Sequence, residues 1–316
     1  MEIVIEGREH VLTKKPVYIG YGGEGIIYKG VIDRQEYMLK FHRDDDLQSR
    51  VRQILDRVSK RKQPSVLSFR SFPVGSGTAK ASEIERDGED YMVMAFRWIN
   101  GKKFSEYMQD DFKNANIELK KRQAKSLLEA LNFFENCGIV HGDLSVDNIL
   151  VDDLENFHII DVEGAGLTHR RILNQWVFKP RTFGTAIPGF PRAPELQRGS
   201  ISLYVDRWAA AQLVAFILTA QIPFAFLKVF DYKSLEELMG IAEDFRKNEK
   251  FEYSWPPLGS ENHSNVNTNF NIEAARREFK KSSPYLPFLL YKTFIFGFNN
   301  PKRRPSSREW LTRLGI

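Results

Sequence analysis

The sequence has a single cysteine, Cys137, among its 316 residues. One thiol cannot form an intramolecular disulfide, and it cannot supply a CxxC metal site. The first residues, Met1 to Glu6, also lack the basic stretch and the apolar run of a secretory signal peptide. We therefore expect a protein of a reducing compartment, and we place it in the cytoplasm.

A strong excess of charge of one sign is absent as well. The 46 basic and 41 acidic residues leave a formal net charge of +5, which is too small to indicate nucleic acid as a partner. With 42% hydrophobic and 28% charged residues, the chain has the composition of a folded globular protein. Its partners must therefore be inferred from particular sites.

The segment from Trp208 to Leu227 contains no charged residue. Its length meets the criterion for a membrane span, but Gln212, Thr219 and Pro223 interrupt the apolar run. We therefore expect a buried core helix here and no membrane span.

The pattern of the elements changes near residue 100. Before it, short β-branched and aromatic runs between glycine and aspartate turns predict a small antiparallel sheet, with one amphipathic helix from Leu47 to Val58. After it, helical periodicity dominates, with a strand pair around 148–161 and helices near 104–113, 117–137, 203–221, 234–248, 272–281 and 285–296. The expected fold class is α+β, with a sheet lobe followed by a larger helical lobe.

Glycines at positions 20, 22 and 25 form the pattern G-x-G-x-x-G. The residues after Gly25 are β-branched, so we expect a strand-loop-strand hairpin instead of the helix that follows this pattern in dinucleotide-binding folds. Such a loop can cover phosphates with backbone N–H groups, and Lys40 on the next strand can add a cation. Taken alone, these residues fit an ordinary hairpin with a surface lysine equally well.

A second cluster begins at His141-Gly142-Asp143 and reaches Asn148 ahead of an apolar strand, and Asp161 follows the next apolar strand. The side chains of Asp143, Asn148 and Asp161 can converge on one point. Mg²⁺ requires oxygen ligands of this kind together with phosphates. A carboxylate that does not bind the metal, Asp143, can orient an incoming hydroxyl and accept its proton.

With these motifs the sequence resembles the protein-kinase superfamily over nearly its whole length. Three motifs later in the sequence resemble those of the eukaryotic-type protein kinases. These motifs are Ala193-Pro194-Glu195, Asp206-Arg207-Trp208 and the segment Pro301 to Ser306. The resemblance implies an ion pair between Glu195 and Arg304. It also implies that Asp206 braces the catalytic loop, His141 to Asn148.

The resemblance further implies one protein-kinase domain over residues 1–316. Its parts would be a small lobe, a hinge and a large lobe, at residues 1–95, 96–101 and 102–316. Met94 would end the strand that precedes the hinge.

The same resemblance implies an ATP site with Mg²⁺ and a protein as the second substrate. Asp143 and Lys40 would be catalytic, and Asn148 and Asp161 would bind the metal. The residues implied to contact ATP are Ile19, Gly20, Gly22, Gly25, Ile27, Lys40, Met94, Phe96 and Leu150.

Three departures from the family pattern lie near the expected active site. Gly142 replaces an arginine that in many kinases pairs with a phosphorylated activation segment. Ser145 replaces a lysine of Ser/Thr-specific kinases, and Asp161-Val162-Glu163 stands in place of D-F-G.

A fourth departure concerns the partner of Lys40. Val51 occupies the helix position where the family has a glutamate that pairs with this lysine, and no glutamate occurs from Phe41 to Ser82. A buried lysine without a partner tends to lose its charge. Lys40 therefore needs another carboxylate, and the candidates are Asp56 and Asp161.

We predict ATP-dependent phosphoryl transfer to a protein hydroxyl, on Ser or Thr. A nucleotide-binding pseudokinase scaffold stays open as an alternative, because the helix glutamate is missing and Met38 would narrow the adenine pocket. A small-metabolite kinase is a further alternative, which Gly142 and Ser145 favour. Lys40, Asp143, Asn148 and Asp161 occur together, and a chain released from catalysis has no chemical reason to keep all four.

Overall fold

The computed structural model describes residues 2–5, 8–12, 15–22, 25–42, 45–61, 71–80, 91–110, 112, 115–169, 175–187, 192–197, 199–221 and 272–316. The helix expected at 234–248 and the end of the charge-free run lie outside these residues. The chain divides into two compact units. Unit 1 comprises Met1–Gly101 and Ile160–Glu163, and unit 2 comprises Lys102–Ile159 and Gly164–Ile316.

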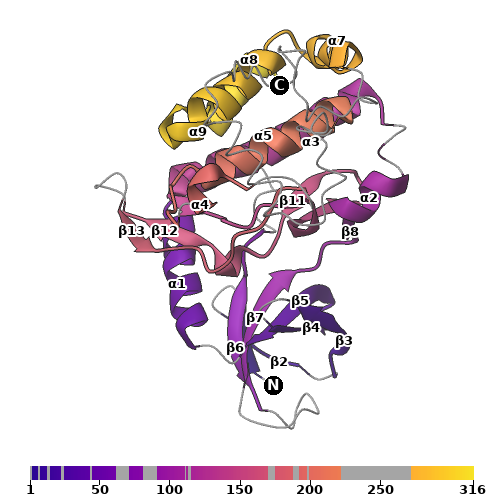
Figure 1. Ribbon diagram of the computed structural model, residues 1–316. Coiled ribbons are helices and arrows are strands. Elements are labelled where there is room, and N and C mark those ends of the chain that lie inside the picture. Colours follow the sequence, from indigo (N-terminus) through magenta and orange to yellow (C-terminus); the bar gives the residue numbers. More distant parts are fainter. Residues whose placement is uncertain are drawn as a thin grey trace. The chain divides into compact units, whose positions relative to one another are not determined.

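Unit 1 contains a seven-stranded sheet in the order β2-β1-β6-β7-β5-β4-β3, with neighbouring strands antiparallel (Figure 1). Its elements are β1 (Glu2–Ile5), β2 (Arg8–Val11), β3 (Val17–Gly22), β4 (Gly25–Ile32), β5 (Gln35–His42), helix α1 (Asp45–Ser59), β6 (Gly75–Ala79) and β7 (Tyr91–Arg97). The expected small antiparallel sheet with one helix is confirmed.

The core of unit 1 forms on one face of this sheet. Side chains alternate between the faces along a strand, and Tyr28, Leu39, Phe41 and Val93 belong to one buried cluster. The residues between them therefore point to the opposite face, and Lys40 is one of these.

Two features of the sheet differ from the sequence-based expectation. Strands β1, β2 and β6 were not predicted, and the sequence of β6, GSGTA, is typical of a turn. Strand β7 does not end at Met94 but continues through Arg97, because pairing with β5 persists to the Tyr37–Arg97 pair.

Unit 2 is mostly helical, as expected. Strand β8 (Gly101–Lys103) lies at the boundary between the units and joins the sheet β11-β10-β8, and a third sheet has the order β13-β12-β9. The other elements are α2 (Phe104–Asp110), α3 (Ile117–Cys137), β9 (Ile139–Val140), β10 (Ile149–Asp152), β11 (Phe157–Ile159), β12 (Gly166–Thr168), β13 (Trp176–Phe178), α4 (Pro194–Gln197), α5 (Val205–Thr219), α7 (Ile272–Ser282), α8 (Leu286–Tyr291), α9 (Gly297–Asn299) and α10 (Ser307–Leu314).

Local signals fix the ends of helix α3. The side chain of Asn116 accepts a hydrogen bond from the backbone N–H of Leu119 at 2.9 Å, which satisfies one of the unpaired donors of the first turn. Gly138 ends the helix in the left-handed conformation with φ of 71°, which glycine adopts without steric cost. The chain then enters β9, the strand directly before the catalytic loop.

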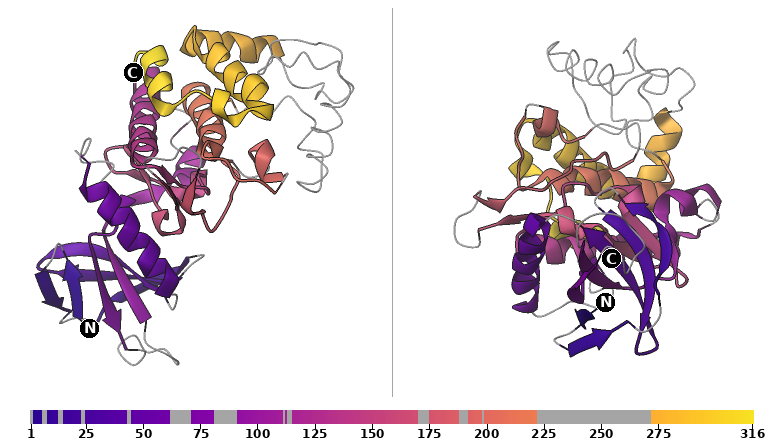
Figure 2. Two further views of the ribbon diagram at one scale, coloured as in Figure 1. Left: turned by 90° about the vertical axis from the view of Figure 1, so that its left-hand side faces the viewer. Right: turned by 90° about the horizontal axis from the view of Figure 1, so that it is seen from below.

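Helix α5 forms the centre of the helical packing. It contacts α3, α7 and α8, and Figures 1 and 2 show these helices together. All its residues from Ala210 to Thr219 are buried, so the buried core helix expected from the charge-free run is confirmed as far as Thr219. Within the described residues, no helix combines the length and the apolar composition that crossing a membrane requires.

Candidate functional site

Four of the predicted site residues form one row across the sheet of unit 1. Gly20 pairs with Ile27, Ile27 pairs with Lys40, and Lys40 pairs with Met94 on successive antiparallel strands. Residues that lie directly opposite each other share a face of the sheet. The row therefore lies on the face opposite the core cluster.

Two further predicted residues lie near this row. Phe96 is opposite Met38 on β5, two positions along each strand from the Met94–Lys40 pair, so it shares the same face. Ile19 lies where the pairing of β3 with β4 shifts register, and it is exposed. Leu150 belongs to unit 2, where it is half-buried in β10 opposite His158.

The glycines of the G-x-G-x-x-G pattern have different surroundings. Strand β3 ends at Gly22, and β4 begins at Gly25, as the expected hairpin requires. A Cβ added at Gly25 would lie 2.5 Å from the carbonyl oxygen of Phe41, so close packing against β5 requires glycine there. Nothing lies within 4 Å of a Cβ added at Gly20, so packing in the described structure does not explain that glycine.

Lys40 is buried, and its ammonium contacts two carboxylates. Its Nζ donates hydrogen bonds to Oδ1 of Asp161 and to Oε1 of Glu163. Burial by itself would lower the pKa of Lys40, but the charges of Glu163 and Asp161 outweigh it, and the pKa is raised above 10.5. Lys40 therefore remains a cation, which phosphate binding requires.

Glu163 was not among the predicted partners of Lys40. Of the two candidates, Asp161 is confirmed, and Asp56 is wrong because it pairs with Lys60 at 2.5 Å on the exposed side of α1. Asp161 has a left-handed backbone with φ of 66°, and a short helical turn from Val162 follows. The lack of a glutamate on the helix was the signal that could have directed attention to Glu163.

In unit 2, the carboxylate of Asp206 holds the start of the catalytic loop. Its Oδ2 accepts a hydrogen bond from the backbone N–H of His141 at 2.6 Å, and its Oδ1 accepts one from Gly142 at 2.8 Å. Burial raises the pKa of Asp206 and Asp143 adds to this effect, while His141 and the two backbone donors act against it. The bracing role implied by the family resemblance is confirmed.

Asp143 is half-buried in this loop, and its carboxylate lies against Gly184. A Cβ added at Gly184 would overlap Oδ1 of Asp143. Asn148 donates through Nδ2 to the backbone carbonyl of Asp143 at 2.8 Å, which leaves its amide oxygen as an acceptor. Unit 2 thus brings Asp143 and Asn148 together, as predicted.

The residue that replaces the arginine of H-R-D needs to be a glycine. Gly142 has φ of +82°, and a Cβ there would lie 2.5 Å from Cβ of Pro180. A Cβ at Gly166 would collide with the ring of the same proline. The segment after β13 is therefore held against the catalytic loop by Pro180, packed onto two glycines, and by a hydrogen bond from the Arg181 N–H to the Gly164 carbonyl at 2.9 Å.

A buried ion pair fixes the far end of this segment. Arg304 donates to Glu195 through Nη1 at 2.7 Å and through Nη2 at 2.5 Å, so the predicted pair is confirmed. Burial raises the pKa of Glu195, but the hydrogen bonds and charge of Arg304, with a hydrogen bond from Ser202, prevail and lower it below 4.5.

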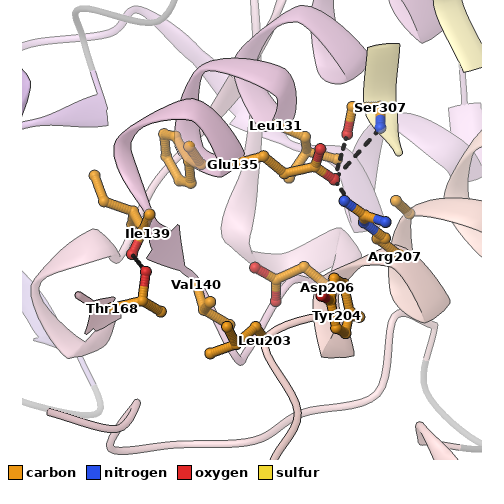
Figure 3. A pocket seen from close by; sticks show the side chains of 13 residues that line it. Leu131, Glu135, Ile139, Val140, Thr168, Leu203, Tyr204, Asp206, Arg207 and Ser307 are labelled. Carbon is orange, nitrogen blue, oxygen red and sulfur yellow. Dashed lines mark hydrogen bonds and ion pairs between the residues drawn. The ribbon is translucent and has the colours of Figure 1, made fainter. Parts of the chain in front are cut away.

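A cavity of about 270 Å³ lies beside the Asp206 brace, between α3, β9 and the start of α5 (Figure 3). At its rim, Glu135 accepts from Nε of Arg207 at 3.0 Å and from Oγ of Ser307 at 3.3 Å. Arg207 also donates to the backbone carbonyl of Arg304 at 3.0 Å. Arg207, the residue after Asp206, thus joins α3 to the backbone of Arg304, and Glu135 joins α3 to α10.

Comparison with known proteins identifies the class. A family model described as "Protein kinase domain" matches residues 14–309 of this chain. The chain therefore belongs to the protein kinase domain family, as the sequence motifs indicated.

Two curated relatives match parts of the chain. "Sperm motility kinase Tcr mutant form" of Mus musculus is 32% identical over 115 residues, which cover 36% of this chain and 21% of the relative. "Putative tyrosine-protein kinase C03B1.5" of Caenorhabditis elegans is 31% identical over 126 residues, which cover 38% of this chain and 35% of the relative. Both names describe kinases, and of the two only the second states an acceptor amino acid, tyrosine.

We expect Gly184→Ala to lower turnover at least tenfold while the fold persists, because the added Cβ would displace the Asp143 carboxylate. The measurement is the initial rate of phosphoryl transfer beside the thermal unfolding midpoint. Gly199→Ala is the matched control, since Gly199 has φ of +68° and open space around its Cβ position. The control should lose stability and keep its turnover, and unchanged turnover in Gly184→Ala would contradict the assignment.

We expect Glu195→Gln to reduce the free energy of unfolding by about 3 to 5 kcal/mol near neutral pH, because it leaves the Arg304 charge buried without a counterion. The lowered pKa of Glu195 means that this stabilisation is present above the unfolded-state value of 4.5 and is lost as pH falls through the folded-state value. The measurement is urea unfolding of the unmutated protein and of Glu195→Gln from neutral to acidic pH. The difference between their free energies of unfolding should shrink as the pH falls.

The control for this series is Glu309→Gln, which breaks the half-exposed pair with Lys292. It should cost about 1 kcal/mol or less. An equal cost for both substitutions, or a cost for Glu195→Gln that does not change with pH, would contradict the analysis.

Proposed function

We propose that this protein transfers the γ-phosphoryl group of ATP to a hydroxyl group of a protein, on serine or threonine. The observation that carries the proposal is the contact between Lys40 and Asp161. A cation for phosphates and a carboxylate for the metal that bridges those phosphates must lie close together, and in unit 1 they are in hydrogen-bond contact.

The proposed roles follow from the chemistry of each group. Lys40 binds phosphate oxygens, and the row of residues from Gly20 to Met94 forms the sheet surface for the nucleotide. Asp161 and the amide oxygen of Asn148 are hard oxygen ligands that suit Mg²⁺, which supplies charge neutralisation on the phosphates when it is bound. Asp143 orients the acceptor hydroxyl and accepts its proton.

Several residues support protein kinase activity over a nucleotide-binding scaffold. Asp143 is held by the loop that Asp206 braces, and Lys40 keeps its charge although the helix glutamate is absent. After the metal-ligand region, Glu195 is held by the buried pair with Arg304, and Pro180 packs onto Gly142 and Gly166. The Glu195–Arg304 pair belongs to the motifs that resemble eukaryotic-type protein kinases, so it favours a protein acceptor over a small metabolite.

The test is incubation of the purified protein with γ-labelled ATP and Mg²⁺, offered generic protein acceptors and small polyols in parallel. Label in protein supports the proposal, and hydrolysis of the labelled protein identifies phosphoserine, phosphothreonine or phosphotyrosine. Label in the polyols alone would favour a small-metabolite kinase, and no label would favour a scaffold.

Asp143→Asn should lower turnover by roughly 10²- to 10⁴-fold, the usual effect of removing a general base, with little change in ATP affinity. The matched control is Asp147→Asn, because Asp147 is exposed in the same loop and accepts a hydrogen bond from Ser105. Initial rates and ATP titrations check both variants. Turnover retained in Asp143→Asn would remove Asp143 from the mechanism.

Asp161→Asn should weaken the binding of Mg²⁺–ATP as well as turnover, because it removes one formal charge from the proposed metal site. The measurement is nucleotide affinity with and without Mg²⁺. The substitution should matter more with the metal than without it. Equal affinity of the unmutated protein in both conditions would speak against a metal-dependent nucleotide site.

A further inference from the structure

Lys40 does not have the partner that the family resemblance places on the helix. Helix α1 contains no glutamate, and its Val51 is buried with an exposed fraction of 5%. Leu47, Ile54 and Val58 are also buried, so the covered face of α1 is apolar. Among the side chains of α1 that the structure describes, no carboxylate lies on that face, because Asp46 and Asp56 are exposed.

Glu163 supplies the missing charge from another part of the chain. Its side chain has an exposed fraction of 0%, against 29% for Asp161, and its Oε1 contacts the ammonium of Lys40. Among the described residues, its second oxygen, Oε2, has no hydrogen-bond partner, so the contact with Lys40 is what compensates the burial of this carboxylate. Asp161, the more exposed of the two, keeps its proposed role as a metal ligand.

We infer that Glu163 is the positioning residue of Lys40 and does in this chain the work that the family assigns to a glutamate on the helix. The inference rests on the proposed function, since it gives Lys40 the role of binding phosphates. A lysine side chain has many rotamers, and a dedicated buried carboxylate limits it to those that direct Nζ to one place.

This arrangement has a consequence for regulation. Glu163 lies two residues after Asp161, and both belong to unit 1 together with Lys40. The pairing of Lys40 therefore depends on the segment that carries the proposed metal ligand and not on the position of α1. A displacement of α1 would leave the ion pair of Lys40 intact.

A double-mutant cycle tests the inference with Glu163→Gln, Lys40→Met and the combined variant. Glu163→Gln should lower kcat/KM for ATP by about 10- to 100-fold and lower the thermal unfolding midpoint. In the Lys40→Met background it should cause no further loss of kcat/KM. There it should raise the midpoint, because it removes a buried carboxylate whose cation is gone.

The matched control is Glu36→Gln, which removes a carboxylate from the half-exposed pair with Lys29 on the same sheet. Glu36→Gln should change kcat/KM for ATP by no more than about twofold. It should shift the thermal unfolding midpoint only slightly. If Glu163→Gln does not fold, Glu163→Asp replaces it in the cycle, with a smaller loss that should vanish in the same background.

Equal losses in both backgrounds would overturn the inference, because Glu163 would then act on the metal or on folding independently of Lys40. A Glu163→Gln variant with the properties of the unmutated protein would overturn it as well. If no variant transfers phosphate but the sign of the midpoint change still reverses, the proposed function fails while the pairing of Glu163 with Lys40 stands.

Discussion

The chemistry proposed for this protein depends on one buried cation. Lys40 lies inside unit 1, where an ammonium without counterions would tend to lose its proton. Asp161 and Glu163 prevent this, and both come from one short segment whose left-handed turn at Asp161 directs two carboxylates to the same nitrogen. The sheet places Lys40 in a row with Gly20, Ile27 and Met94, so the charge and the surface proposed for the nucleotide are fixed by the same hydrogen-bonded strands.

In unit 2, packing and one ion pair hold the segment that follows β13. In many kinases a phosphorylated residue and the arginine of H-R-D order the activation segment. Here Pro180 packs onto Gly142 and Gly166, and the Glu195–Arg304 pair holds the far end. Asp206 braces the loop that carries the proposed base. Steric fit at Pro180 and the ion pair at Glu195 therefore hold the described parts of this segment in unit 2.

Much of this could be predicted from the sequence because the signals were local or repeated. Helix α5 has no charged residue from Trp208 onward, and Lys40, Asp143, Asn148 and Asp161 follow motifs with fixed spacing. The rest depended on contacts distant in sequence. Glu163 stands where D-F-G has glycine, and the motif alone does not show that its side chain reaches Lys40 on strand β5. The glycine-rich strand β6 forms because β1 and β7 pair with it, which overrides its turn-like composition.

The central claim is that Glu163 holds Lys40 for phosphate binding. A crystal structure of the protein with Mg²⁺ and a nonhydrolysable ATP analogue tests it most directly. We expect Nζ of Lys40 to contact both the phosphate oxygens and the Glu163 carboxylate, and Asp161 to bind the metal. A structure in which Glu163 has left Lys40, either to bind the metal or to face solvent, would contradict it.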